Sequence, residues 1–560
     1  GIQSRHSITM EMRDIHPSHL GFLDSLNTPE SFKVGINVGL ASEVRKIKKD
    51  LEVPVVDKNN KIHWLNPTQF YKYKIGFPDQ YDIYDGKVKP NFDQVTVMYK
   101  GETIKIPHKE VDYYLRSPRT MFSLTTNLVP FLMNVQGNRG ATSSRMLTQA
   151  LPLDEKEPPL VRTYRDSQST YEDLIGGFLN PTSPVDGTIS KIDKNYIYIK
   201  EDKTNRTHKI GLYNDFPLNQ DGYLNSTVLV KEGQKIKKGD ILTENNYSTG
   251  KVLSLGKNLR VAYLSYKGKN FEDGIVISES AANKLSHTMI HKIDIFANPK
   301  QSIFDKAKFN AWFPDVISTD NFNKLDDRGI IKVGSTVYPD EVVCAFLVKN
   351  ELDELAATLK KLDKQAFNIY KKNITVWDEE DTGIVTDVRV NGPHIDIYIK
   401  SKHPLKEGDK IVSRYGNKGI VTKIVPDSEM PHDEEGRPIE VLLSPEGVPG
   451  RMNIGQILET AASKLARKTG KPYIVNNFEK PNMDMANQLY KELKKHNIKI
   501  NETLTDGKTG EKIKEPIFTG EQYFIKLRHI IKKKQGAVNY GVYDENEQPA
   551  GKGAQKIGHL

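Results

Sequence analysis

One short segment, KEGDKIVSRYGNKGIVTK at 406–423, combines basic side chains with glycines. Lys410 and Lys418 stand near these glycines, with Arg414 and Asn417 between them. Glycine allows a phosphate to approach the backbone closely, and paired ammonium groups neutralise its charge. The spacing therefore fits phosphate binding, although two solvated β-turns would show the same pattern. Neither GxxxxGK[ST] nor GxGxxG occurs, which excludes a P-loop and a dinucleotide-binding fingerprint.

A second segment, SPEGVPGRMNIGQILET at 444–460, places Arg451 just before an expected helix. The first turn of that helix holds Asn453 and Gln456. A helix N-terminus with an arginine beside it suits an anion. The prolines and glycines of the same segment would equally form an ordinary loop before a helix.

The segment NFEDG at 270–274 carries two adjacent carboxylates, Glu272 and Asp273, on a turn between two β-rich runs. Such a pair can approach a divalent cation directly or through water. The alternative is an ordinary charged turn.

The segment GNRGATSSRMLTQALP at 137–152 contains Arg139, Arg145 and Gln149, which could contact a nucleic-acid backbone or a triphosphate. A capped surface helix would look the same.

The composition narrows the class of protein. Among 560 residues, 81 Lys and Arg outnumber 72 Asp and Glu, and the net charge of +9 favours a polyanionic partner such as nucleic acid. The single cysteine, Cys344, excludes an intrachain disulfide and a Cys/His zinc array, and its apolar surroundings (VVCAFLV) predict burial. No apolar run approaches 18 residues, so we expect a soluble, unexported chain in a reducing compartment, with no membrane association.

Local patterns predict a β-rich, mixed α/β chain of several domains. Alternating residues predict strands at 95–100 and 103–108, a compact β module at 183–260, two strands within 261–280 and a hairpin at 384–400. Helical spacing predicts helices at 281–293, 351–373, 453–468 and 484–497. His287 and His291, four residues apart in the first of these helices, lack an HExxH glutamate and are expected to be exposed.

Read in order, several blocks resemble the β subunit, the second-largest subunit, of multisubunit DNA-dependent RNA polymerases. The blocks are RDIHPSHLGFLDSLNTPESFKVGINVGLAS (13–42), LVPFLMNVQGNRGATSSRMLTQALP (128–152), LRVAYLSYKGKNFEDGIVISES (259–280), EGDKIVSRYGNKGIVTKI (407–424), MPHDEEGRPIEVLLSPEGVPGRMNIGQILET (430–460) and TLTDGKTGEKIKEPIFTGEQYFIKLRHII (503–531). They span nearly the whole chain, and the two from 407 to 460 are the most specific.

The resemblance implies a fold with a double-psi β-barrel, a sandwich-barrel hybrid-type module and a flap. The implied domains are a fork-like segment (1–42), a connecting region with a nucleotide-proximal helix (43–182), the barrel/hybrid module (183–260), the first part of the double-psi barrel (261–310), a flap-like domain (311–400), the second part of the double-psi barrel (401–470) and a C-terminal region leading toward the clamp (471–560). The leucine face of the helix at 351–373 would then dock a partner or pack on its own domain.

The resemblance also implies roles for individual residues. Lysines matching Lys410 and Lys418 contact phosphates of the RNA 3′ end and the initiating nucleotide, and arginines matching Arg451 and Arg139 approach the incoming triphosphate. These four would be the catalytic, charge-stabilising residues of nucleotidyl transfer.

The carboxylates matching Glu272 and Asp273 would lie near the second, nucleotide-borne Mg²⁺, through water and not as primary ligands. The residues expected to contact nucleic acid are Arg5, Arg13, Glu30, Arg145, Gln149, Arg414, Asn417, Asn453 and Gln456.

The partners implied are a β-amino-half-like chain, a β′-like chain or chains with the aspartate triad, an initiation or promoter-specificity factor, the DNA template, the RNA product and nucleoside triphosphates. The Mg²⁺ would be held mainly by the β′-like chain, because the motif NADFDGD does not occur here. The many substitutions and the expected split of the subunit favour a giant-bacteriophage polymerase acting in the host cytoplasm. The alternative function is a non-catalytic nucleic-acid-binding scaffold of the same fold.

Overall fold

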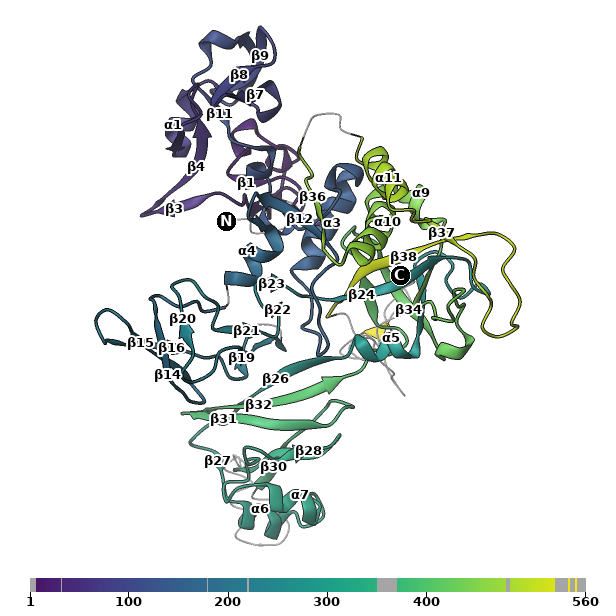
Figure 1. Ribbon diagram of the computed structural model, residues 1–560. Helices are drawn as coiled ribbons and strands as arrows, with labels where there is room; N and C mark the ends of the chain where they lie inside the picture. The colour runs from purple at the N-terminus through teal and green to yellow at the C-terminus, as the bar shows by residue number, and fades with distance from the viewer. Residues whose placement is uncertain are drawn as a thin grey trace. The chain divides into compact units, whose positions relative to one another are not determined.

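The computed structural model describes residues 7–31, 33–178, 180–218, 221–349, 370–479 and 484–528, with the backbone of 542–543 and 549–550. Two compact units result, each built from segments that are distant in the sequence (Figure 1). The first unit comprises Gly1–Pro181, Tyr247–Leu285 and Leu405–Leu560, and the second comprises Thr182–Asn246 and Ser286–Pro404. Arg5 and residues 351–369 of the predicted leucine-faced helix lie outside the described residues.

A closed six-stranded barrel forms the centre of the first unit. Its strands are β24 (Lys257–Tyr263), β35 (Val441–Leu443), β25 (Gly274–Ser278), β34 (Lys418–Val425), β33 (Lys410–Val412) and β38 (Ile517–Lys526). The neighbours pair in that order, and β38 closes the ring by pairing antiparallel with β24. The interior contains branched apolar side chains such as Val261, Ile277 and Val421, which are fully buried. Because the ring is closed, each of the six strands is paired on both sides.

Helices pack on the barrel strands and around them. The helices of the first unit are α1 (Pro67–Lys72), α2 (Leu124–Asn127), α3 (Gly137–Leu147), α4 (Tyr171–Phe178), α5 (Glu279–Lys284), α9 (Gly447–Arg451), α10 (Ile454–Thr469) and α11 (Met485–Lys495). In α10 the apolar residues recur at helical spacing, and Leu458, Ala462 and Leu465 are buried against α11 and neighbouring elements. Helix α10 also packs along β38, as Figure 1 shows, and α5 packs on β25 and β34.

A peripheral sheet precedes the barrel in the sequence. Its strands are β3 (Arg45–Ile47), β4 (Asp50–Val56), β5 (Ile62–Leu65), β6 (Ile75–Gly76), β9 (Gln94–Tyr99), β10 (Glu102–Pro107) and β11 (Tyr113–Leu115). Strands β9 and β10 confirm the predictions at 95–100 and 103–108. The small sheet of β12 (Val161–Asp166), β13 (Ser169–Thr170) and β36 (Tyr473–Val475) lies in the same unit.

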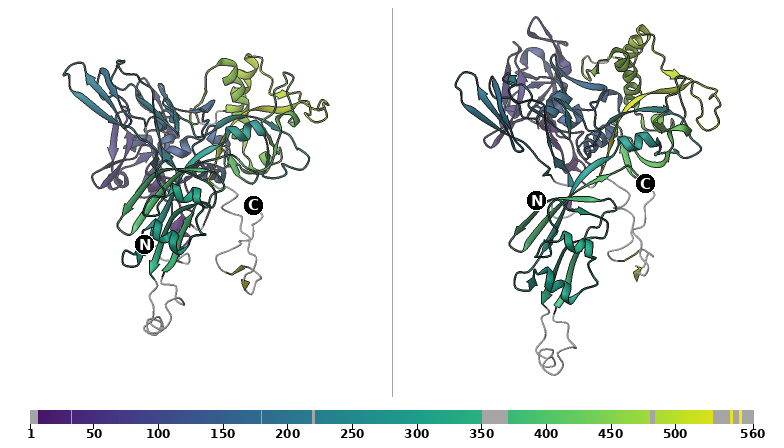
Figure 2. Two further views of the ribbon diagram at one scale, coloured as in Figure 1. Left: turned by 90° about the horizontal axis from the view of Figure 1, so that it is seen from below. Right: turned by 60° about the horizontal axis from the view of Figure 1, so that its bottom comes forward.

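The second unit is built almost wholly from antiparallel strands (Figure 2). One sheet contains β14 (Gly187–Ile192), β15 (Tyr196–Glu201), β16 (Thr207–Gly211) and β20 (Lys235–Ile236), and a second contains β26 (His287–Phe296), β28 (Thr336–Val337), β31 (Gly383–Asn391) and β32 (His394–His403). A third contains β27 (Ser302–Ile303), β29 (Val342–Lys349) and β30 (Tyr370–Val376), next to α6 (Lys306–Trp312) and α7 (Thr319–Lys324). Strands β31 and β32 confirm the hairpin predicted at 384–400, and Cys344 is buried as expected.

The helices predicted at 351–373 and 281–293 differ from the structure in the residues that it describes. Residues 370–373 belong to β30, which pairs with β29. The helix expected at 281–293 ends at Lys284, and β26 begins at His287. Strand β26 pairs with β32 along its whole length. His287 and His291 are buried, so the prediction that they are exposed is wrong. His291 Nε2 lies 3.1 Å from His403 Nε2.

Two boundaries also differ from the expected domains. Residues 247–260 group with the first unit and not with the β module of 182–246. Strand β38, which closes the barrel, comes from the segment expected to lead toward the clamp.

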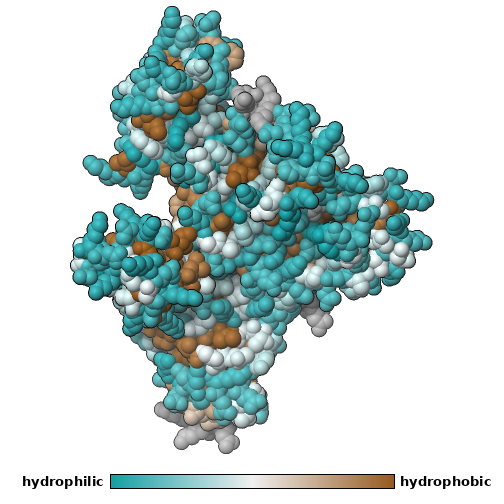
Figure 3. Space-filling model, in the orientation of Figure 1, coloured by the Kyte–Doolittle hydropathy of each residue, from teal (hydrophilic) through white to brown (hydrophobic). Residues whose placement is uncertain are grey.

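In the part of the chain that the structure describes, no helix is both long and apolar enough to cross a membrane. The face shown in Figure 3 is largely hydrophilic, with small and separate hydrophobic patches.

Candidate functional site

The barrel brings together three of the four segments singled out in the sequence. Their residues line one cavity of about 40 Å³, which includes Glu272, Asp273, Lys418, Asn417 and Arg451. The segment at 264–273, which carries Glu272 and Asp273, joins β24 to β25. The loop at 413–417 joins β33 to β34, and the loop after β35 leads to α9. Because β25 and β34 are adjacent and parallel, the ends that carry these loops lie at the same edge of the barrel.

Close packing of two backbones fixes the relation between Lys418 and the carboxylates. A Cβ atom on Gly419 would lie 2.3 Å from Ile275 Cδ1 and 2.8 Å from the carbonyl oxygen of Asp273. Ile420 N donates to that same carbonyl oxygen at 3.0 Å. A glycine is therefore required after Lys418, and it holds the lysine beside the turn that carries Glu272 and Asp273.

Lys410 and Lys418 project from the same face of the β33–β34 hairpin. Lys410 pairs with Ile420 and Val412 pairs with Lys418, so all four side chains point to one side. Lys418 is exposed, and its ammonium group forms no hydrogen bond or ion pair with any residue that the structure describes. Its charge is available to an anion that enters the cavity.

Arg451 and Asp273 form an ion pair at the wall of the cavity. Both side chains are about one quarter exposed, so the pair lies at the boundary between protein and solvent. Arg451 ends the short helix α9, and Met452 then adopts a left-handed conformation with φ +48°. Glu272, also in a left-handed conformation with φ +51°, is exposed beside the pair.

The polar residues predicted beside these charges mainly support the loops. Asn417 Nδ2 donates to Gln456 Oε1 at 2.8 Å, and Asn453 Nδ2 donates to the carbonyl oxygen of Tyr415 at 2.7 Å. Asn453 and Gln456 are almost fully buried. Both side chains therefore support the loops, and Gln456 also lines the cavity, so its contact with nucleic acid stays a prediction.

Arg414 differs most from its prediction as a nucleic-acid contact. Its guanidinium is buried, with Glu459 Oε1 at 2.8 Å and Glu172 Oε1 at 3.6 Å, and it donates to the carbonyl oxygen of Val161 at 2.8 Å. Burial disfavours the charged guanidinium, but the two carboxylates outweigh this effect and raise the pKa of Arg414. Arg414 is thus an internal support of the 413–417 loop.

The segment at 137–152 contacts the same loop from the outside. Arg139 Nη1 donates to the carbonyl oxygen of Gly416 at 3.2 Å, and Ser143 Oγ donates to that of Arg414 at 2.6 Å. Gly416 has φ +70°, and a Cβ atom there would lie 2.4 Å from the carbonyl oxygen of Arg139. Arg139 does not line the barrel cavity but orients one of its loops. Arg145 and Gln149, farther along, do not line it either.

The fork-like segment is braced locally. Thr142 Oγ1 donates to Glu30 Oε1 at 2.7 Å, which ties this segment to α3. Arg13 Nη1 donates to the carbonyl oxygen of Val34 at 3.0 Å. Glu30 and Arg13 therefore hold the segment together, whether or not they also contact a strand of nucleic acid.

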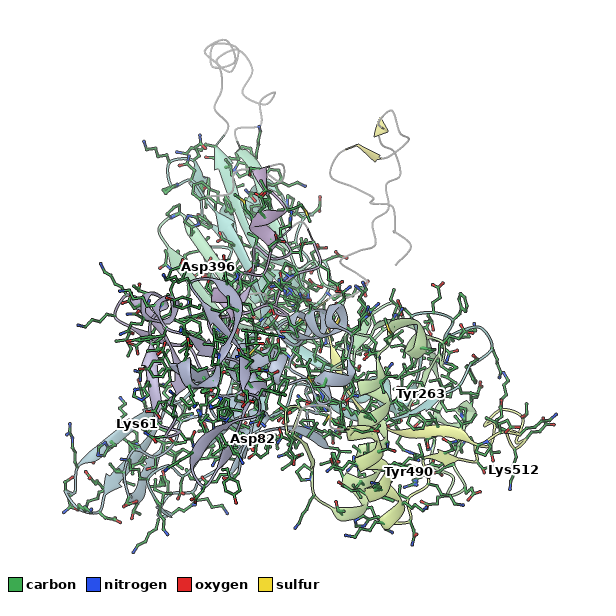
Figure 4. The ribbon with its side chains drawn as sticks, turned by 90° about the horizontal axis from the view of Figure 1, so that it is seen from above. Lys61, Asp82, Tyr263, Asp396, Tyr490 and Lys512 are labelled. Carbon is green, nitrogen blue, oxygen red and sulfur yellow. The ribbon has the colours of Figure 1, made fainter. Side chains whose placement is uncertain are left out.

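Sequence reasoning missed three polar residues of the barrel. Tyr263 lines the cavity, and its hydroxyl accepts a hydrogen bond from Gln522 Nε2 on β38; Figure 4 labels Tyr263. Burial raises the pKa of the Tyr263 hydroxyl, so it remains a neutral donor. Lys526, also on β38, is buried with its ammonium 3.2 Å from Asp409. Nothing local in the sequence marks a residue whose partner lies more than one hundred positions away.

The donor set does not fit a primary Mg²⁺ site. Asp273 is engaged by Arg451, which leaves Glu272 as the other carboxylate in the cavity. Among the described residues, no group of three or more His, Cys, Asp or Glu side chains is arranged to hold a metal ion. Mg²⁺ sites use carboxylate oxygens together with water or phosphate oxygens.

Comparison with known proteins identifies the class to which this fold and site belong. The family model described as RNA polymerase Rpb2, domain 6, matches residues 182–555, and the model described as RNA polymerase Rpb2, domain 3, matches residues 1–45. The first match alone covers more than half of the chain. The chain therefore belongs to the RNA polymerase Rpb2 family, which confirms the resemblance to the β subunit.

Its relatives include bacterial proteins named DNA-directed RNA polymerase subunit beta. The chain is 29% identical to that of Prochlorococcus marinus (strain AS9601) over 600 residues, which cover 100% of this chain and 54% of the relative. It is 29% identical to those of Clostridium kluyveri (99% of this chain, 46% of the relative) and Borreliella afzelii (100% and 50%). The chain spans about half the length of the curated relatives that it matches.

Proposed function

We propose that this chain is a subunit of a multisubunit DNA-dependent RNA polymerase and contributes phosphate-binding cations to its active centre. The observation that carries the proposal is the cavity at the edge of the barrel, where Lys418 lies beside the Arg451–Asp273 pair and has no counter-ion among the residues that the structure describes. Membership of the Rpb2 family supports the same conclusion.

In the proposed reaction, these residues act by charge and position. Lys410 and Lys418 hold phosphates of the RNA 3′ end and of the initiating nucleotide, because one hairpin face presents both ammonium groups. Fixed cations of this kind stabilise the negative charge that develops as the nucleotidyl group is transferred. No proton transfer by these lysines is required.

Arg451 is proposed to orient the incoming triphosphate. A guanidinium has five N–H donors in a planar fork, and the recorded contact with Asp273 occupies one nitrogen. Asp273 thus holds the arginine in the cavity while other N–H groups face a phosphate. Arg139 acts on the triphosphate indirectly in this account, through the loop that it orients.

The Mg²⁺ of this chemistry would neutralise phosphate charge and is proposed to be held mainly by a β′-like chain with the aspartate triad. Glu272 would meet the nucleotide-borne ion through water. The barrel would be of the double-psi type, and the second unit would contain the hybrid-type module and the flap.

Further proposed partners are a β-amino-half-like chain, an initiation factor, DNA and RNA. We also propose that the chain comes from a giant bacteriophage. The competing function is a scaffold that binds nucleic acid without catalysis, but an unneutralised lysine in a cavity would then have no evident role.

The test is RNA-primer extension by the assembled complex with altered lysines. Lys410→Ala or Lys418→Ala should leave assembly intact and slow nucleotide addition about 30- to 1,000-fold, equivalent to roughly 2 to 4 kcal/mol of transition-state stabilisation. Lys423→Ala is the matched control, because this exposed lysine is on the same strand and pairs with Glu407 at 3.0 Å. Unchanged rates in a double Lys410→Ala/Lys418→Ala variant would refute the phosphate role.

A further inference from the structure

A second cavity in the first unit is rich in arginine. It has a volume of about 280 Å³ and shares no lining residue with the barrel cavity. Arg116, Arg119 and Arg165 all line it, and the carboxylate among its lining residues is Glu43. Glu43, Arg116 and Arg119 come from the region of the peripheral sheet, and Arg165 comes from β12.

Arg119 is the least exposed of the three guanidiniums and is held in one orientation. Its Nη2 donates to Asn476 Oδ1, its Nη1 donates to the carbonyl oxygen of Arg165 at 3.3 Å, and its guanidinium carbon lies 4.7 Å from the centre of the Tyr164 ring. These contacts are with neutral groups. Burial lowers the pKa of Arg119, although Tyr171, Tyr164 and Glu43 act in the opposite direction.

The charges around Arg119 are not balanced. Arg116 pairs with Glu43 at 2.9 Å, and Arg165 contacts Asp166 at 3.3 Å in an exposed position. No carboxylate within the described residues lies at ion-pair distance from Arg119. A partly desolvated cation without a counter-ion is unfavourable, and a bound anion would offset this cost.

We propose that this cavity binds the phosphate group of a ligand. Arg116 and Arg119 come from one segment and Arg165 from another, and their guanidiniums can give paired N–H donors to a tetrahedral oxyanion, a geometry that Arg matches better than Lys. Ser117 adds a hydroxyl, since its Oγ accepts from the backbone N of Arg119 and can donate its own proton. The site does not rest on the proposed polymerase function.

The cavity also has an apolar wall. Ile62 and Ile83 line it and are 44% and 54% exposed, which is unusual for isoleucine. Its volume is close to the lower end of the roughly 300 to 1,000 Å³ typical of small-molecule sites. These features favour a small phosphorylated molecule of nucleotide size, whereas a nucleic-acid backbone would offer the same phosphate chemistry.

Arginine footprinting on the full chain tests the proposal residue by residue. Phenylglyoxal modifies accessible guanidiniums, and mass spectrometry would follow Arg116 and Arg165, whose side chains are 48% and 42% exposed. Inorganic phosphate at about ten times its Kd should slow their modification roughly tenfold, relative to chloride at equal ionic strength. Arg389, 51% exposed in the second unit, is the control and should react at an unchanged rate.

Variants and ligands complete the test. Arg119→Gln should abolish the phosphate protection of Arg116, and Arg165→Gln, a change at an exposed side chain, should weaken it without affecting the fold. The same protection is measured with adenosine monophosphate and with a single-stranded oligonucleotide. The compound that protects Arg116 and Arg165 at the lower concentration of phosphate groups identifies the source of the bound phosphate. Equal modification rates in every arm, or undiminished protection in Arg119→Gln, would overturn the proposal.

Discussion

Arg414 lies in the loop between β33 and β34, and Lys418 begins β34 four residues later, yet their environments are opposite. Lys418 is exposed at the cavity, whereas Arg414 is buried between Glu459 and Glu172. The sequence shows both as basic residues near glycines and cannot tell which one faces solvent, because Glu459 and Glu172 come from distant segments. The phosphate contact of Lys418 therefore stays a prediction, whereas the burial of Arg414 speaks against the nucleic-acid contact predicted for it.

Removal of the Arg414 charge should destabilise the barrel. Arg414→Met would leave two buried carboxylates without a cation, and we expect the free energy of opening of β33 and β34 to fall by about 3 to 5 kcal/mol. Hydrogen exchange of barrel peptides, followed by mass spectrometry, measures this quantity. Lys423→Met breaks an exposed pair in the same barrel and should cost no more than about 1 kcal/mol. Equal losses in the two variants would contradict the structural role.

Cys344 provides a prediction of pH dependence. Burial, with a smaller effect of Asp326, raises the pKa of its thiol to about 12, whereas an unfolded cysteine titrates near about 8.5. The stability from the buried neutral thiol is fully present below about pH 8.5 and is lost as the pH rises toward about 12. Alkylation of the native chain should therefore accelerate steadily from pH 7 to above pH 9, while the urea-unfolded chain levels off near its own pKa. A plateau near pH 9 in the native chain would show that the thiol is not buried.

At the scale of elements, short-range sequence patterns predicted the helices and strands whose formation depends on residues close together in the sequence. Helix α10 and the β31–β32 hairpin were found from spacing and alternation. The prediction failed at 370–373 and 287–293, where pairing with distant strands overrides helical spacing. Histidines four residues apart share a face in a helix and in a strand, so the spacing of His287 and His291 could not distinguish the two. Barrel closure by β38 is a non-local pairing that no local pattern predicts.

Gly416 should be essential to the loop between β33 and β34. Gly416→Ala adds a Cβ atom 2.4 Å from the carbonyl oxygen of Arg139, at a residue with φ +70°. We expect faster hydrogen exchange at 413–417 and slower nucleotide addition by the complex. Gly436→Ala is matched in backbone strain, with φ +77°, but its Cβ atom meets nothing within 4 Å. The left-handed conformation alone costs about 1 to 2 kcal/mol in each variant. Identical activity in the two variants would contradict the role of the Arg139 contact.

At the scale of the whole molecule, the chain combines a barrel with a charged cavity and a separate β-rich unit. The cavity supplies cations, but its carboxylates do not form a primary Mg²⁺ site. A chain of this kind fits an active centre that several polypeptides share. Membership of the Rpb2 family agrees with that proposal.

The most direct test compares the purified chain with the native complex captured through a tag on it. Both would be given a preassembled RNA–DNA scaffold and nucleoside triphosphates, and extension of the RNA primer would be measured. We predict extension only by the complex, which should contain a chain with the aspartate triad and a β-amino-half-like chain. A complex that includes the triad-bearing chain and binds the scaffold but does not extend the primer would contradict the account and favour the scaffold function.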